Sequence, residues 1–267
     1  MQNFYFITGF MGTGKSTLLQ GIQTHLEERG KKKEDLLIDS VSYPLPTSVE
    51  ENDSIKESVP IKENIHHKYV VMEDLDTYIL KKIDCSISEY FAEEGEIAFR
   101  NLETSCLEEI LVRAVQKNKD NPNMDIHVVI SLGGGCIFSN EARRTILQFS
   151  QLFHHVHCFN LFASMDIINQ RLQGAERTQR PLAANQLQET YAQRTEFWPV
   201  ISEILQHNDI SVTEIQSNRS KQDIFGSVWS TIKQSDSAKK IHEEKINSKK
   251  NIFLNSKHGV PLLEMPW

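Results

Sequence analysis

Short apolar runs alternate along this chain with longer stretches in which apolar residues recur every three or four positions. The runs are about as long as strands and are bounded by turn-forming or charged residues. They lie at Phe4–Thr8, Tyr69–Met72, Ile126–Leu132, Val156–Phe162 and Ile210–Ile215. The stretches between them have one apolar face and predict amphipathic helices. This alternation predicts an α/β fold in which helices cover both faces of a parallel sheet.

A local signal marks one of the helices. Ser86 and Glu89 have the spacing of a capping box, in which each side chain bonds the backbone of the other residue. Gly95 follows six residues later and predicts the end of a short helix, because glycine tolerates the left-handed conformation common at helix ends.

Two stretches depart from the pattern. Residues 31–68 carry three prolines, many charges and a single aromatic residue, Tyr43. They cannot bury enough apolar surface to offset the entropy lost on ordering, so we expect a largely disordered insertion in which only Leu36–Ile38 could form a short element. Residues 234–267 begin Lys-rich and end apolar, and either dock on the domain or hang free. We therefore expect one domain over 1–233 and a C-terminal tail over 234–267.

Composition restricts the compartment and the classes of partner that we expect for this protein. A net charge of −7 over 267 residues argues against a nucleic-acid partner, because a polyanion selects for a basic surface. No apolar run approaches the roughly 20 residues that cross a bilayer, and the first residues lack the basic start of a signal peptide. The four cysteines are scattered and predict buried thiols in a reducing compartment. We expect a cytoplasmic protein with no membrane or nucleic-acid partner, and a monomer.

The residues after the first strand carry a nucleotide-binding signal. Gly9–Ser16 reads Gly-Phe-Met-Gly-Thr-Gly-Lys-Ser and fits the phosphate-loop pattern G-x-x-x-x-G-K-[ST]. The glycines let successive N–H groups face phosphate oxygens, and the following helix adds its positive N-terminal end. Lys15 is expected to reach the β- and γ-phosphates, and the Ser16 hydroxyl to bind Mg²⁺. A strand before the motif and a helix after it make a chance match improbable.

Acidic and basic side chains follow the next strand. Asp74 and Asp76 stand two apart at a strand end, where both would point to the crevice above a parallel sheet. One could help hold the metal while the other accepts a proton from the attacking hydroxyl; the alternative is a pair of solvated turn acids. Further on, Arg100 and Glu103 share one face of a helix. Arg100 could bind a carboxylate with its planar fork, or form an ordinary helical ion pair with Glu103.

Two later segments complete the candidate chemistry. The triplet Gly133-Gly134-Gly135 ends a strand, where α/β folds bind ligands and where glycine permits close approach. The segment Arg177–Leu182 is rich in arginine and precedes a helix that carries Arg194. Such a segment suits a mobile lid that neutralises transition-state charge, although a basic surface loop has the same composition.

Taken in order, these motifs closely resemble the shikimate kinase family. The resemblance covers about residues 1–30 and 69–233. Its matching pieces are the phosphate loop at 9–17, Asp-Leu-Asp at 74–76, the segment 86–100, the glycine triplet, Arg-Pro-Leu at 180–182 and Arg194. It implies a three-layer P-loop kinase fold with a five-stranded parallel sheet in the order 2-3-1-4-5. It also implies transfer of the γ-phosphate of ATP to the 3-hydroxyl of shikimate, in aromatic amino-acid biosynthesis.

The resemblance also implies residue roles. Asp76, Lys15 and Arg180 would be catalytic, with Asp76 deprotonating the hydroxyl and Arg180 acting from the lid. The residues that would bind ATP are Gly12, Thr13, Gly14, Lys15, Ser16, Thr17 and Arg180, with Ser16 and Asp74 on Mg²⁺. The residues that would bind shikimate are Asp76, Arg100, Glu103, Gly133, Gly134, Gly135 and Arg194. Of these, Arg100 and Arg194 would bind its carboxylate, and Glu103 would steady Arg100.

The chain departs from the family pattern in two places. The insertion enters just before the aspartates, and a second lid arginine of the family falls on Gln173, for which Arg171 or Arg177 could substitute. Two other functions stay open from the sequence. One is a gluconate-type small-molecule kinase, although a polyol has less use for two arginines. The other is a nucleotide-binding regulatory protein that has lost catalysis, against which the retained charged residues argue.

Overall fold

The computed structural model describes residues 2–30, 36–39, 68–120, 125–172 and 187–237. The strands are β1 (Gln2–Gly9), β2 (Leu36–Asp39), β3 (Lys68–Asp74), β4 (Asp125–Ser131), β5 (His155–Phe162) and β6 (Ser211–Gln216). The helices are α1 (Lys15–Gly30), α2 (Leu75–Leu80), α3 (Ile87–Asp120), α4 (Asn140–Ser150), α5 (Met165–Arg171), α8 (Leu187–His207) and α9 (Lys221–Ser237), with a short 3₁₀ turn at Cys136–Phe138. In this part of the chain, no helix combines the length and apolarity needed to cross a membrane.

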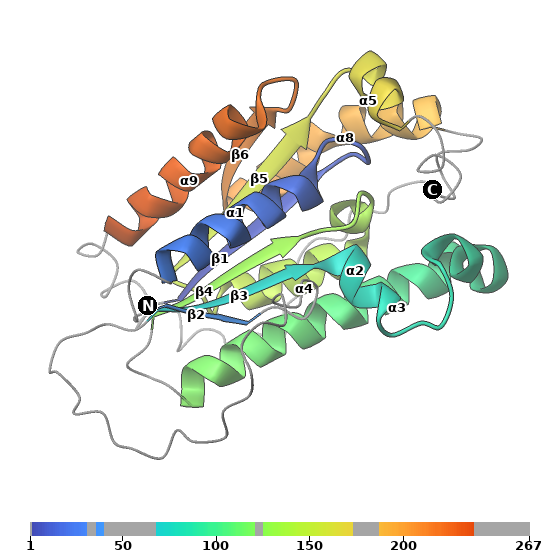
Figure 1. Ribbon diagram of the computed structural model, residues 1–267. Coiled ribbons are helices and arrows are strands. Elements are labelled where there is room, and N and C mark those ends of the chain that lie inside the picture. Colours follow the sequence, from blue (N-terminus) through green and yellow to red (C-terminus); the bar gives the residue numbers. More distant parts are fainter. Residues whose placement is uncertain (1, 31–35, 40–67, 121–124, 173–186, 238–267) are drawn as a thin grey trace, which may run out of the picture.

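All strands run parallel in one sheet, in the order β2-β3-β4-β1-β5-β6 (Figure 1). The five strands predicted from the apolar runs are β1, β3, β4, β5 and β6, so the predicted order 2-3-1-4-5 is confirmed. The α/β class with a parallel sheet is confirmed as well.

The sheet has six strands rather than five. The additional strand β2 lies within residues 31–68, which we expected to be largely disordered, and it pairs with the outer edge of β3 from Leu36↔Lys68 to Asp39↔Val71. The physical reason is that the edge of β3 presents backbone N–H and C=O groups that a further strand can satisfy. Residues 31–35 and 40–67 lie outside the described residues. The predicted tail also begins too early, because α9 continues through Ser237; residues 238–267 are not described.

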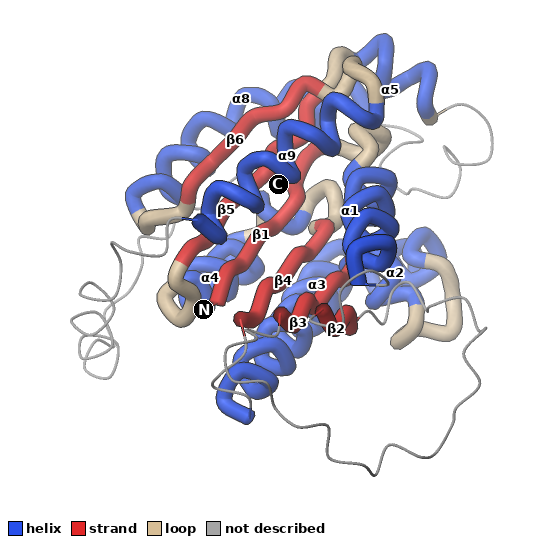
Figure 2. Tube along the Cα trace, turned by 60° about the vertical axis from the view of Figure 1, so that its left-hand side comes forward, coloured by secondary structure: helices blue, strands red, loops and turns tan. Residues whose placement is uncertain are grey.

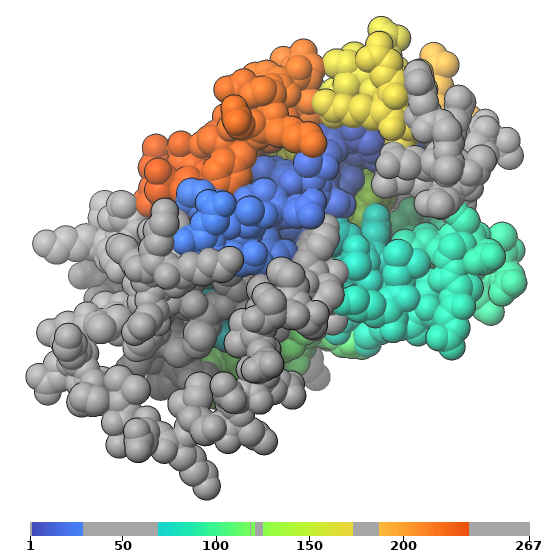
Figure 3. Space-filling view, in the orientation of Figure 1, coloured from blue at the N-terminus to red at the C-terminus, as the bar shows by residue number. Residues whose placement is uncertain are grey.

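Alternation along the strands builds a core on each face of the sheet. On β1, Phe4 and Phe6 belong to the cluster beneath α3, α4 and α8, whereas Tyr5 and Ile7 belong to the cluster beneath α1 and α9. Helices therefore cover both faces, as Figure 2 shows. Helices α1 and α9 are neighbours on one face of the molecule (Figure 3).

The sequence-predicted capping box is confirmed at the start of α3. The Ser86 backbone N–H donates to Glu89 Oε2 at 2.8 Å, and the Glu89 N–H donates to Ser86 Oγ at 3.1 Å. The predicted break is also present, because Gly95 has φ 85° and ψ 172° inside α3 and divides it at a kink. The short first segment thereby leaves the line of the long second segment, which carries Arg100.

The order in which successive strands join the sheet reverses at its centre, between β1 and β4. The helix after β1, α1, packs on one face, and the helix after the adjacent β4, α4, packs on the other. The loops that leave these two strands therefore diverge and open a crevice at their carboxyl ends, the usual ligand position in open α/β sheets.

Candidate active site

The phosphate loop connects β1 to α1 at this crevice. Gly12 and Gly14 have φ values of 76° and 92°, a region that side-chain-bearing residues rarely adopt, so the loop can curl only with glycine there. Lys15 begins α1, and its Nζ donates to the Gly9 carbonyl at 2.9 Å and the Phe10 carbonyl at 3.2 Å. The ammonium group thus lies folded against the loop that would hold the phosphates.

A cavity of about 540 Å³ opens beside the phosphate loop. It is lined by Gly12–Leu18 on one side and by Arg171, Ser217, Arg219, Lys221 and Phe225 on the other. The sequence reasoning missed all of the second group except Arg171. Arg219 and Lys221 follow the last strand at its carboxyl end, and this position is the signal that could have found them.

Arg171 connects the two sides of this cavity. Its Nη1 donates to the Gly12 carbonyl and to Ser217 Oγ, each at 3.1 Å, and its Nη2 donates to the Ser217 carbonyl. The sequence left Arg171 and Arg177 as possible substitutes for the family arginine that falls on Gln173. Arg171 lies at the cavity beside the phosphate loop. Arg177 and Gln173 lie outside the described residues, as does the proposed lid residue Arg180.

Ser16, in the first turn of α1, lies beside Asp74, at the end of β3. The Ser16 hydroxyl donates to Asp74 Oδ2 at 2.7 Å, while Asp74 Oδ1 accepts from the Thr77 N–H and hydroxyl, each at 3.1 Å, and caps α2. A hydroxyl and a carboxylate held together at a phosphate loop are oxygen ligands of the kind that Mg²⁺ prefers. These two residues fit the metal that the sequence predicts.

Asp76 reaches the same place by another route than predicted. Strand β3 ends at Asp74, and Asp76 lies in the first turn of α2, so the two carboxylates do not come together by strand alternation. Both nevertheless line a second cavity of about 410 Å³. Asp76 and Ser16 line this cavity and the nucleotide cavity as well, which places Asp76 where the two spaces meet.

Arg100 and Glu103 form an ion pair on α3. Arg100 Nη1 lies 2.7 Å from Glu103 Oε2, and Glu103 is 1% exposed. Burial works against the charged guanidinium, but the charge and hydrogen bond of Glu103, together with the charge of Glu96, outweigh it and raise the pKa of Arg100. Glu103 thus holds Arg100 in place and helps to keep it charged. Arg100 can therefore form the helical ion pair and bind a carboxylate at the same time.

Arg194 approaches the same space from α8. Its Nη1 donates to the Gly134 carbonyl at 2.9 Å, and its guanidinium carbon lies 5.3 Å from the ring centre of Phe10 and 5.6 Å from that of Phe138. Burial, and next the positive charge of Arg100, lower the pKa of Arg194 to about 10. Arg194 is still charged at neutral pH, and an anion between the two arginines would relieve both effects.

The glycine triplet lets charged side chains approach the backbone closely. A Cβ atom on Gly135 would lie 2.5 Å from Arg100 Nη2 and 2.8 Å from Arg194 Nη2, so both guanidinium groups face one small space. A Cβ atom on Gly133 would collide with Glu103 and lie 2.8 Å from Asp76 Oδ1. Larger residues at these positions would therefore displace the arginines, Glu103 or Asp76.

The second cavity has one charged wall and one apolar wall. Asp76, Arg100 and Arg194 provide the charges, and the apolar side is lined by Leu80, Ile87, Phe91 and Phe99. Such a lining suits a small ring that carries hydroxyl groups and a carboxylate.

Comparisons with known proteins agree with this geometry. A family model described as shikimate kinase matches residues 67–233, a stretch that begins after the phosphate loop. A shikimate kinase of Streptococcus thermophilus is 36% identical over 118 residues, which make up 44% of this chain and 63%, just under two thirds, of that protein. A shikimate kinase of Staphylococcus aureus is 32% identical over 180 residues, covering 63% of this chain and 86% of that protein.

The fold also matches a solved structure. The structure of shikimate kinase from Acinetobacter baumannii in complex with shikimate has a TM-score of 0.51 to this chain at 19% identity. The match covers 87% of this chain and 93% of that one.

Proposed function

This chain belongs to the shikimate kinase family, and on that premise we propose that it transfers the γ-phosphate of ATP to the 3-hydroxyl of shikimate. The products would be shikimate 3-phosphate and ADP. The observation that carries this proposal is the pair of guanidinium groups, Arg100 and Arg194, that face one small space across from Asp76.

The arginine pair supports a carboxylate-bearing acceptor. A planar guanidinium can bind a carboxylate through two parallel hydrogen bonds, and burial strengthens such charge-assisted bonds. A neutral polyol would leave the buried positive charge of Arg194 without an anionic ligand, a costly arrangement. This argument disfavours neutral acceptors, whereas gluconate also carries a carboxylate; the apolar wall of the second cavity is what favours the ring of shikimate.

Asp76 is proposed to act as the base. It lines both cavities, so a hydroxyl of the bound acceptor and the γ-phosphate of ATP would meet beside its carboxylate. The carboxylate would orient the 3-hydroxyl and accept its proton as the phosphoryl group is transferred, a role that aspartate plays in other kinases.

Positioning and charge stabilisation would do the rest. Gly12–Thr17 would bind the phosphates through backbone N–H groups, and Lys15 would leave its carbonyl partners for the β- and γ-phosphates. Ser16 and Asp74 would hold Mg²⁺, which when bound neutralises charge on the phosphates. Arg180 is proposed to stabilise the transferred group from the lid.

The direct test measures ADP release from MgATP with shikimate, with gluconate and with no acceptor. Strong release that depends on shikimate is expected, with the product identified as shikimate 3-phosphate by mass spectrometry. Release with gluconate alone would identify a different small-molecule kinase. Intact ATP binding without release for any acceptor would instead favour the nucleotide-binding regulatory protein.

A further inference from the structure

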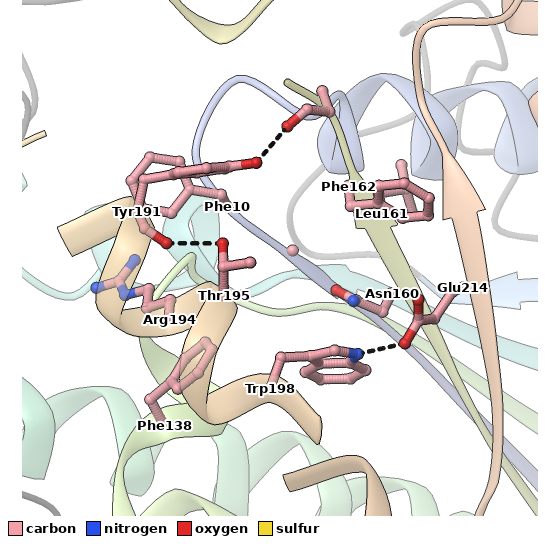
Figure 4. Close-up of a pocket in the computed structure, with 12 residues that line it drawn as sticks. Phe10, Phe138, Asn160, Leu161, Phe162, Tyr191, Arg194, Thr195, Trp198 and Glu214 are labelled. Atoms are coloured by element: carbon pink, nitrogen blue, oxygen red, sulfur yellow. Dashed lines mark hydrogen bonds between the residues drawn. The ribbon is translucent and has the colours of Figure 1, made fainter. Parts of the chain in front are cut away.

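A third cavity lies on the far side of Arg194 from the acceptor cavity, between α8 and the carboxyl-terminal halves of β5 and β6. Its volume is about 170 Å³. Aromatic side chains from the phosphate loop, the 3₁₀ turn, β5 and α8 form most of its wall, as Figure 4 shows: Phe10, Phe138, Phe162, Tyr191 and Trp198. It shares Arg194 with the acceptor cavity but no catalytic group.

One polar side chain in this wall, Asn160, has no hydrogen-bond partner among the described residues. Asn160, in β5, is 8% exposed and lines the cavity, yet its side-chain amide forms no hydrogen bond with any residue that the structure describes. An amide offers two donor hydrogens and an acceptor oxygen, and in Asn160 they have no partner from the described part of the chain at the cavity that this residue lines. The amide is thus a built recognition group for a molecule in the cavity.

A carboxylate lies beside this amide. Asn160 and Glu214 are direct neighbours across β5 and β6, and both side chains line the cavity (Figure 4). Trp198 Nε1 donates to Glu214 Oε1 at 2.6 Å, which orients the carboxylate and leaves Oε2 as an acceptor among the described residues. The polar end of the cavity therefore offers an amide next to a negatively charged acceptor.

We propose that this cavity is a second small-molecule site and that it binds a single aromatic ring bearing a neutral carboxamide. A cavity of about 150 Å³ lined by apolar side chains is large enough for benzene, so this one admits one ring with a small substituent. The carboxamide would pair with the Asn160 amide and donate its second hydrogen to Glu214. Arg194 and Glu214 line the cavity with opposite charges, so neither a carboxylate nor an ammonium group gains a net attraction there, and an ammonium group would also offer Asn160 no acceptor.

The site is positioned to act on the acceptor site. Phe10 and Phe138 line this cavity and also stack against the Arg194 guanidinium. A ring that fills the cavity would restrain both aromatic side chains and pre-organise Arg194, so we expect shikimate to bind two- to fivefold more tightly. This coupling rests on the proposed function, whereas the binding of the ring does not.

The test titrates the full-length protein with benzamide, benzoate and benzylamine by ligand-observed NMR, without ATP. Benzamide is expected to bind with a dissociation constant of about 1 mM or below, given its few atoms, and at least tenfold more tightly than the other two. Asn160→Leu should lose this preference while the protein stays folded with a melting temperature close to that of the parent, because the amide forms no hydrogen bond with the described residues. Glu214→Gln should weaken benzamide and strengthen benzoate, while Glu203→Gln, which removes an exposed charge from α8, should change neither.

Equal binding of the three probes, or unchanged benzamide binding by Asn160→Leu, would overturn the site. Displacement of benzamide by saturating shikimate would also overturn it, because that result places the ring in the acceptor cavity. Benzamide binding without any change in shikimate affinity would overturn the coupling. A protein that fails to phosphorylate shikimate would still bind benzamide, so failure of the proposed reaction is distinguished from failure of this site.

Discussion

At the scale of single residues, Asp76 is the side chain on which the proposed chemistry depends most directly. Asp76→Asn keeps the size of the side chain and a hydrogen-bond acceptor but removes the base. We expect kcat to fall by about 10²–10⁴, the usual contribution of a general base, with the ATP dissociation constant unchanged. Steady-state kinetics and nucleotide titration measure the two effects. Asp84→Asn is the matched exposed control, and normal turnover by Asp76→Asn would remove Asp76 from this role.

His157 provides a prediction about pH. Burial, and next the neighbouring His155, lower its pKa to about 4, while its Nε2 lies 2.8 Å from Thr213 Oγ1. The folded protein therefore binds this proton more weakly than the unfolded chain does, for which the pKa is near 6.5. Stability is fully present above pH 6.5 and declines as the pH falls towards 4.

The loss attributable to His157 is on the order of 2–3 kcal/mol over that interval. It is measured as the difference in unfolding free energy between pH 7.5 and pH 4.5, from urea titrations of the parent and of His157→Gln. The variant should lose less stability over this range than the parent does. The same loss in both proteins would show that His157 does not titrate in this way, and His207→Gln is the exposed control.

At the scale of elements, the kink in α3 sets the position of Ile87 and Phe91, which line the acceptor cavity, relative to Arg100. Gly95 has φ 85° and nothing within 4 Å of where a Cβ atom would stand, so Gly95→Ala costs conformational strain but creates no collision. We expect a loss of about 1 kcal/mol in unfolding free energy.

Gly226 is a matched control with the opposite sign. It lies inside α9 with open space around it, so Gly226→Ala should stabilise the protein by about 0.5–1 kcal/mol. Thermal or urea unfolding of both variants tests the pair. Stabilisation by Gly95→Ala would show that the left-handed conformation at this residue is not required.

At the scale of the whole molecule, the site is built by strands other than the added one. Lys15, Asp76 and the glycine triplet follow the ends of β1, β3 and β4, whereas β2 only extends the edge of the sheet. A short turn cannot replace 40–67 alone, because parallel neighbours need a long connection between them. The informative variant replaces residues 31–67 with a short turn, and so removes β2 as well.

We expect this variant to retain kcat/KM for shikimate within about threefold, because no group of the proposed mechanism is removed. It should aggregate more readily, because the edge of β3 loses its partner strand. Enzyme kinetics and light scattering against the parent protein measure the two outcomes. A large loss of activity in a folded variant would show that the segment shapes the acceptor site.

Local patterns in the sequence identified most of the fold and much of the site. The phosphate loop, the capping box and Gly95 could be identified because each depends on neighbours a few residues away. The strands could be identified because their short apolar runs indicate buried segments. The sixth strand was foreseen only as a possible short element at Leu36–Ile38, because its four residues are stabilised by pairing with β3 residues 32 positions later in the chain.

The sequence by itself determined the class of fold, the strand order through the family resemblance, and a phosphate loop followed by acidic and basic residues. Only the tertiary structure decided that Arg100 and Arg194 face one space, that Asp76 lines two cavities, and that Arg171 and Ser217 stand opposite the phosphate loop. The physical reason is that these arrangements depend on distances between groups far apart in the chain. Those distances are set by how the helices pack on the two faces of the sheet.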